Sequence, residues 1–229
     1  MTFGPLPGTA VEARTIPDLL AGTKKSILTG ARATEAAVLA GRRPRVLHLA
    51  THGFFLRDQP PSPVGARGVA LVELTKEPAS QGAASYENPL VRSGLALAGA
   101  NRAADTASSM DGLLTALEVS AMDLHGTDLV TLSACETGVG DVRIGEGVFG
   151  LRRAFALAGA RHLLMSLWPV ADQATARQML AFYRRYGSGM TPARALRQAQ
   201  LETIRELREQ QGVAPPALWA PFILQGPPA

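Results

Sequence analysis

Residues 128–138 read DLVTLSACETG, an alternating apolar run that stops at a group of turn residues. The alternation predicts a β-strand over residues 128–132, and Cys135, the one cysteine of the chain, follows directly after it. A second apolar run, residues 45–50, stops at Thr51-His52-Gly53, so we expect His52 at the end of another strand. A thiol near pKa ~8.5 is mostly protonated at neutral pH unless a base lies beside it. The pattern therefore predicts a catalytic Cys-His dyad.

Length and composition fit one intracellular enzyme domain. The chain has 229 residues, of which 46% are hydrophobic, enough to bury one core, and we expect a single domain over residues 1–229. One cysteine excludes an intramolecular disulfide, and a reduced thiol is typical of the cytoplasm. No apolar run has membrane-spanning length, and residues 1–8 lack the features of a secretion signal. These features predict a cytoplasmic protein without membrane contact.

The net charge of +4 does not by itself indicate a nucleic-acid partner. The basic residues are scattered, mostly as arginines on predicted helices, and no aromatic residues alternate with them to stack on bases. We expect a solvated surface that binds no nucleic acid.

Helical and strand patterns alternate along the chain. The predicted helices cover residues 10–20, 33–40, 111–122, 145–158, 172–186 and 191–210, and the predicted strands cover residues 24–29, 45–50, 128–132 and 161–168. Asp111 is the expected cap of its helix. Segments 57–88 and 101–110 are rich in turn residues and are expected to be mobile loops, with a possible small hairpin at 68–74. Strands separated by helices predict an α/β fold with a mostly parallel sheet and helices on both faces.

In such sheets reactive groups gather at the carboxyl ends of neighbouring strands. His52 and Cys135 both meet this rule. The amide of Gly53, unhindered by a side chain, is expected to join the amide of Cys135 in stabilising the oxygen of an attacked carbonyl. The predicted chemistry is acyl transfer.

Several strings extend the pattern over most of the chain: HLATHG at 48–53, NPLVRSGLAL at 88–97, SACETGVG at 133–140, GEGV at 145–148, AGAR at 158–161, SLWPV at 166–170 and WAPF at 219–222. On these strings the chain resembles the CHAT peptidases. They are relatives of caspases and separase, and in bacteria they are often joined to tetratricopeptide repeats. The resemblance implies a caspase-like three-layer sandwich and a cysteine endopeptidase that acts on a specific protein partner.

The resemblance also implies site residues. His52 and Cys135 would form the dyad, and Gly53 with Cys135 the oxyanion hole, without a metal or other cofactor. Ser133, two residues before the cysteine, would shape the substrate pocket, while Ser166 and Trp168 follow from their place at a predicted strand end beside the cleft. The chain holds no repeat of about 34 residues. A sensor, of tetratricopeptide or other type, would therefore lie elsewhere in a longer protein, of which this would be the C-terminal part, or on a partner.

Competing interpretations remain open. The fold could serve as a catalytically idle interaction or signalling module, or the lone thiol could be a redox sensor, although it lacks a resolving cysteine. His48 has no partner ligands at zinc-binding spacing and is expected to be a hydrogen-bonded core histidine. The glycines of segment 138–147 lack the Lys-Ser/Thr ending of a phosphate loop.

Overall fold

The computed structural model describes residues 2–20, 22, 24–55, 89–105, 110–133, 146–168 and 170–227. The helices are α1 (Pro7–Leu19), α2 (Glu35–Leu39), α3 (Ala116–Ser120), α4 (Glu146–Leu157), α5 (Asp172–Gly187), α6 (Pro192–Gln211) and α7 (Pro216–Trp219), with 3-10 turns η1 (Gly30–Arg32), η2 (Pro89–Val91) and η3 (Ala100–Asp105). The strands are β1 (Val46–Leu49), β2 (His52–Phe55), β3 (Ser93–Ala96), β4 (Leu113–Thr115), β5 (Leu129–Leu132), β6 (His162–Ser166) and β7 (Phe222–Gln225).

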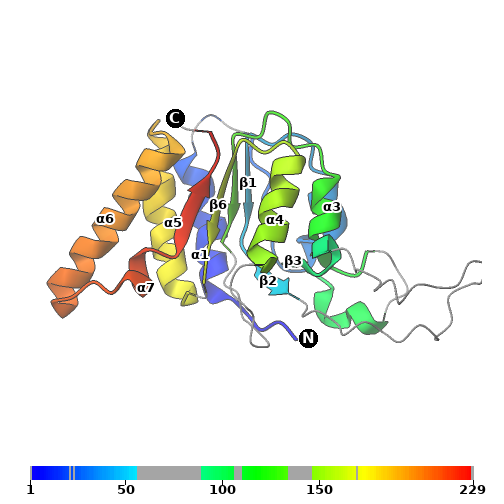
Figure 1. Ribbon diagram of the computed structural model, residues 1–229, viewed down its shortest axis with the longest axis horizontal. Helices are drawn as coiled ribbons and strands as arrows, with labels where there is room; N and C mark the ends of the chain where they lie inside the picture. The colour runs from blue at the N-terminus through cyan, green and yellow to red at the C-terminus, as the bar shows by residue number, and fades with distance from the viewer. Residues whose placement is uncertain are drawn as a thin grey trace, which may run out of the picture.

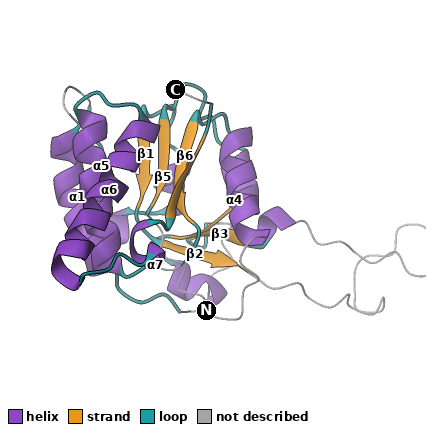
Figure 2. Ribbon diagram, turned by 60° about the vertical axis from the view of Figure 1, so that its left-hand side comes forward, coloured by secondary structure: helices purple, strands orange, loops and turns teal. Residues whose placement is uncertain are grey.

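A four-stranded sheet in the order β1-β5-β6-β7 forms the centre. The pairs β1–β5 and β5–β6 are parallel, and β7 adds antiparallel to β6. Helices α1, α5 and α6 lie on one side of this sheet, and α3 and α4 on the other (Figures 1 and 2). The predicted α/β class and mostly parallel sheet are confirmed. Strand β7 and helix α7 have no counterpart among the predicted elements.

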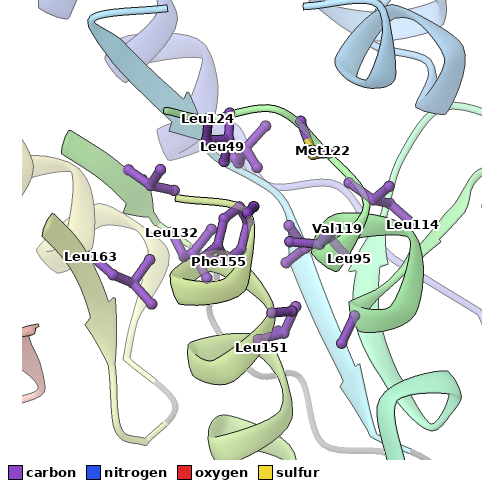
Figure 3. Close-up of a cluster of buried hydrophobic side chains, with 14 of the residues drawn as sticks. Leu49, Leu95, Leu114, Val119, Met122, Leu124, Leu132, Leu151, Phe155 and Leu163 are labelled. Carbon is purple, nitrogen blue, oxygen red and sulfur yellow. The ribbon is translucent and has the colours of Figure 1, made fainter. Parts of the chain in front are cut away.

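The buried strands carry apolar side chains on both faces. Along β6, Leu163 contributes to the core shared with α3 and α4, whereas its neighbour Leu164 contributes to the core under α5 and α6. This alternation follows from the two-residue period of a strand, and it explains why β5 and β6 read as continuous apolar runs. In the first core, Leu132 of β5 lies close to Phe155 of α4 (Figure 3). Burying one such side chain stabilises the fold by about 1.5–3 kcal/mol.

A second sheet, in the order β2-β3-β4, is antiparallel and was not predicted. His52 and Gly53 therefore do not sit in a turn at the tip of β1. They are the first two residues of a separate strand, β2, in which His52 pairs with Ala96 and Gly53 with Leu95. Strand β2 lies across one end of the central strands (Figure 2). The partner strand is about forty residues away in the sequence, so local patterns could not reveal the pairing.

The predicted strand at residues 24–29 is wrong, because the structure has no strand in this segment. Ile27 and Leu28 are 43% and 40% exposed, and the segment lines a cavity together with β1, the edge strand of the central sheet, without joining that sheet. A β-prone sequence forms a strand only where a partner completes its hydrogen bonds.

The predicted helix at residues 111–122 begins too early. Residues 113–115 form β4, and α3 begins at Ala116 with Thr115, not Asp111, as its cap. Thr115 and Glu118 make a capping box in which each side chain bonds the other residue's backbone amide. The Asp111 carboxylate instead accepts a hydrogen bond from the Leu113 amide at 2.8 Å, which shapes the turn before β4.

The other predicted elements agree with the structure to within a few residues, including the helices now labelled α1, α2, α4, α5 and α6. Residues 57–88, with the hairpin at 68–74, and residues 106–109 lie outside the described chain, so the mobility of these loops stays a prediction. Residues 100–105 form the 3-10 turn η3. None of the helices in the described ranges is both long and apolar enough to span a bilayer.

We predict that Thr115→Ala lowers the free energy of unfolding by about 1 kcal/mol, because it removes the hydroxyl half of the capping box. Urea unfolding followed by circular dichroism measures the change. Ser120→Ala removes a hydroxyl of the same helix whose hydrogen bond to the Leu117 carbonyl is exposed, and this matched control should stay within about 0.5 kcal/mol of wild type. Equal stability of the two variants would contradict the assignment of the cap.

Candidate active site

His52 is held by the backbone of a segment far away in the sequence. His52 is 6% exposed, and its Nε2 lies 2.7 Å from the carbonyl oxygen of Gly4. A carbonyl oxygen can only accept a hydrogen bond, so Nε2 carries the proton. In the neutral ring Nδ1 is then the basic nitrogen. The ring of Phe3 lies against His52, with centroids 5.6 Å apart and planes tilted by 35°. The structure thus fixes both the tautomer and the orientation of the predicted base.

The parallel pairing of β1 with β5 defines where the cysteine segment leaves the sheet. Leu49 pairs with Leu132, and the Ser133 amide still donates to the Leu49 carbonyl at 3.0 Å. His52 comes three residues after Leu49, and Cys135 three residues after Leu132. Cys135 itself lies outside the described residues. The described chain therefore brings together His52, Gly53 and Ser133 at one end of the β1–β5 pair.

Beneath this end lies a buried polar network. The Ser133 hydroxyl donates to one carboxylate oxygen of Glu12 at 3.0 Å, and the other oxygen lies 2.9 Å from Nε2 of His48. Nδ1 of His48 lies 3.1 Å from the Tyr183 hydroxyl, which donates to the hydroxyl of Thr131 at 2.8 Å. Glu12 is only 1% exposed. The network ties α1 and α5 to β1 and β5.

Proton accounting shows how the Glu12–His48 contact is made. Because the Tyr183 proton goes to Thr131, its oxygen accepts from Nδ1–H of His48. The contact between His48 Nε2 and the Glu12 carboxyl group then needs one further proton, shared between them. Burial raises the pKa of Tyr183, which keeps this hydroxyl neutral and able to donate. His48 is thus hydrogen-bonded through both ring nitrogens, as predicted, but its side chain is 16% exposed and lies at the edge of the core.

Ser133 was predicted to shape a substrate pocket. Its side chain is 2% exposed and its hydroxyl points to Glu12. The hydroxyl therefore bonds the buried Glu12 carboxylate. A role for Ser133 in a substrate pocket stays a prediction.

Ser166 and Trp168 lie at the carboxyl end of β6, which is parallel to β5. Both are partly exposed, and the Trp168 indole N–H donates to the Ala217 carbonyl at 3.2 Å. Since β5 lies between β1 and β6, these two residues stand on the opposite side of the β5 end from His52. Their predicted role in a substrate groove remains a prediction.

A cavity of about 970 Å³ opens beside β1 and reaches His52. Its walls include β1, segment 24–34 and residues 96–102. His52 is largely buried and is one of the residues that line this cavity. Ser166 and Trp168 are not part of its lining.

In the described ranges no three His, Cys, Asp or Glu residues are grouped as metal ligands. The two ring nitrogens of His48, the histidine weighed as a zinc ligand, face Tyr183 and Glu12.

One family model and two curated relatives match almost the whole chain. The family model described as "CHAT domain" matches residues 1–227. The chain belongs to the CHAT family. Two curated relatives cover 98% of it: human tetratricopeptide repeat protein 28, at 29% identity, and the mouse protein of the same name, at 26% identity. The chain spans only 8% and 9% of the length of these relatives.

The site contains residues that the sequence did not identify. No orienting group for His52 was predicted, because the acceptor is the main-chain carbonyl of Gly4, and backbone groups leave no sequence signature. Glu12 was missed because a single acidic residue in a helix is usually solvated. Its place on the same helix face as Ile16, at i and i+4, was the one available hint of burial.

We predict that Glu12→Ala lowers the free energy of unfolding by about 3 kcal/mol, because it leaves the Ser133 hydroxyl and the His48 ring without their buried partner. Glu12→Gln keeps the shape and should lose less. Urea denaturation measures both values.

Glu209→Ala, an exposed acidic position on α6, is the control and should match wild type. A loss below about 1 kcal/mol in Glu12→Ala would mean that the network contributes little to stability.

Proposed function

We propose that this CHAT domain is a cysteine endopeptidase with a caspase-like three-layer sandwich, which cleaves a specific protein partner through His52 and Cys135. The observation that carries the proposal is the parallel pairing of Leu49 with Leu132, since each dyad residue follows its strand by three residues. Paired strands lie about 4.8 Å apart, and two residues of chain, the separation of Cys135 from Ser133, span at most about 7 Å. A direct Cys-His contact is therefore within reach of the chain.

The orientation of His52 supports its role as the base. With Nε2–H held by Gly4, Nδ1 would accept the proton of the Cys135 thiol, and the sulfur would attack the scissile carbonyl carbon. His52 would return this proton to the leaving amine as the peptide C–N bond breaks, which leaves a thioester. Water would then attack the thioester, with His52 taking its proton and returning it to the sulfur. The neutral Gly4 carbonyl is a sufficient orienter, because a thiol ionises far more readily than a serine hydroxyl.

The position of Gly53 supports a place in the oxyanion hole. A Cβ atom built on Gly53 would meet nothing closer than the Gly94 carbonyl oxygen at 3.9 Å, so the fold itself does not require glycine here. Gly94 in the paired strand differs, because its Cβ would lie 2.4 Å from the Leu114 carbonyl oxygen. Packing in the fold does not explain why residue 53, next to the base His52, is glycine. Close approach of a substrate carbonyl would explain it, because a side chain would block that approach.

The partner would be a protein whose segment lies across the β5 end, between His52 and the Ser166–Trp168 side. The printed name of the human and mouse relatives refers to tetratricopeptide repeats. We propose that a repeat domain of this kind, in the same protein or on a partner, presents the substrate or controls the site.

We predict that iodoacetamide alkylates Cys135 at pH 6.5 at least about tenfold faster in the wild type than in His52→Ala. An unassisted thiol is only about 1% ionised at this pH, whereas an imidazole partner raises the thiolate fraction. The measurement is the pH profile of labelling by mass spectrometry, with Cys135→Ala as the blank. Identical profiles for wild type and His52→Ala would favour the alternative, a catalytically idle interaction module.

Incubation with lysate of the host cell, followed by sequencing of new protein termini, identifies the substrate. Termini that appear with the wild type and not with Cys135→Ala mark cleavage sites. If iodoacetamide labels Cys135 readily but the lysate shows no new termini, a redox role for the thiol is favoured.

We predict that Gly53→Ala folds with unchanged stability and cleaves that substrate about tenfold more slowly, because the methyl group displaces the approaching carbonyl. Gly94→Ala, the paired control, should instead lower the melting temperature, because its methyl group has no space. Cleavage by Gly53→Ala at the wild-type rate would remove Gly53 from the oxyanion hole.

A further inference from the structure

Asn101 holds the backbone of Phe3 with both ends of its carboxamide. The Phe3 amide donates to Oδ1 of Asn101 at 2.7 Å, and Nδ2 of Asn101 donates to the Phe3 carbonyl at 3.0 Å. Only one orientation of the carboxamide satisfies both bonds. Two bonds to one residue fix its peptide planes as a neighbouring strand would, although the two residues are 98 positions apart.

The next residue, Gly4, is the one that orients His52. We call residues 2–6 the strap; both ribbon views show the N-terminus at the end of the molecule where β2 lies (Figures 1 and 2). Gly4 is exposed, and a Cβ built on it would meet no atom within 4 Å. Packing therefore does little to place its carbonyl, and the anchors on either side must do so.

The strap has an anchor on each side of Gly4. On the C-terminal side of Gly4, the Gly8 amide donates to the Asp172 carboxylate at the start of α5, and a Cβ on Gly8 would lie only 2.6 Å from that carboxylate. On its N-terminal side, Asn101 holds the backbone of Phe3. Gly4 contacts His52 between these two anchors. Loss of either anchor would therefore allow the Gly4 carbonyl to move away from the ring.

We propose that Asn101 is a positioning residue of the active site: it holds the Phe3 backbone so that the Gly4 carbonyl keeps the proton of His52 on Nε2 and leaves Nδ1 as the base. The catalytic part of this inference rests on the proposed Cys-His function, whereas the effect on the His52 tautomer does not. Phe3, His52 and Asn101 all line the 970 Å³ cavity beside β1, so the strap stands directly beside the site it orients.

Asn101→Ala in the full chain tests the proposal. Nitrogen-15 chemical shifts of the His52 ring at neutral pH should show the Nε2–H tautomer in wild type and a mixture of both tautomers in the variant. Alkylation of Cys135 at pH 6.5 should fall about tenfold, because a misplaced base no longer faces the thiol. Since Asn101 is exposed, the melting temperature should not change.

Two further variants sharpen the test. Glu209→Ala changes an exposed side chain on α6 that does not line the cavity, and it should keep the wild-type tautomer and rate. Asn101→Asp keeps the acceptor for the Phe3 amide and loses the donor, so it should fall between wild type and Asn101→Ala. It also serves as the readout if the alanine variant is unstable.

An unchanged tautomer in Asn101→Ala overturns the inference, whatever happens to the rate, because Asn101 is proposed to act only through His52. If wild type and His52→Ala alkylate alike, the endopeptidase proposal fails, while the tautomer measurement still tests the role of Asn101. The two failures are therefore distinguishable.

Discussion

The pairing of β1 with β5 is the constraint on which the site depends. Strand β5 is buried between two helical layers, and β1 is the partly buried edge strand beside it. Their parallel register brings two segments more than eighty residues apart to one end of the sheet. A shift of one residue would exchange the two faces of a strand and place core leucines against the wrong helices. The apolar packing that fixes the fold therefore also fixes which polar residues share this end of the sheet.

Two polar systems meet at that end, and they differ in kind. In the Glu12–His48–Tyr183 network the two end members are buried and depend on His48 for hydrogen bonds. The contact between Gly4 and His52 lies near the surface and uses a main-chain oxygen. The first system makes the strand ends rigid, and the second sets the direction of one ring. Rigidity and direction are separate requirements for a Cys-His site, and this chain meets them with separate residues.

Much of the fold could be predicted from sequence because the central strands are short apolar runs bounded by turns and helices with amphipathic patterns. The failures share a cause: β2, β4 and β7 are defined by partners distant in the sequence, and segment 24–29 has strand propensity without a partner. The candidate histidine could be predicted because a lone imidazole after an apolar run is conspicuous. Its surroundings could not, since they consist of a glycine carbonyl, an isolated glutamate and a tyrosine whose burial appears only in three dimensions.

The two ends of the described chain lie at opposite ends of the molecule, and only one of them is close to His52. The C-terminus emerges at the end of the molecule away from β2, whereas the first residues lie against the imidazole (Figures 1 and 2). A substitution in the strap can therefore reach the ring of His52 through the Gly4 carbonyl, whereas β7 ends at the opposite end of the molecule.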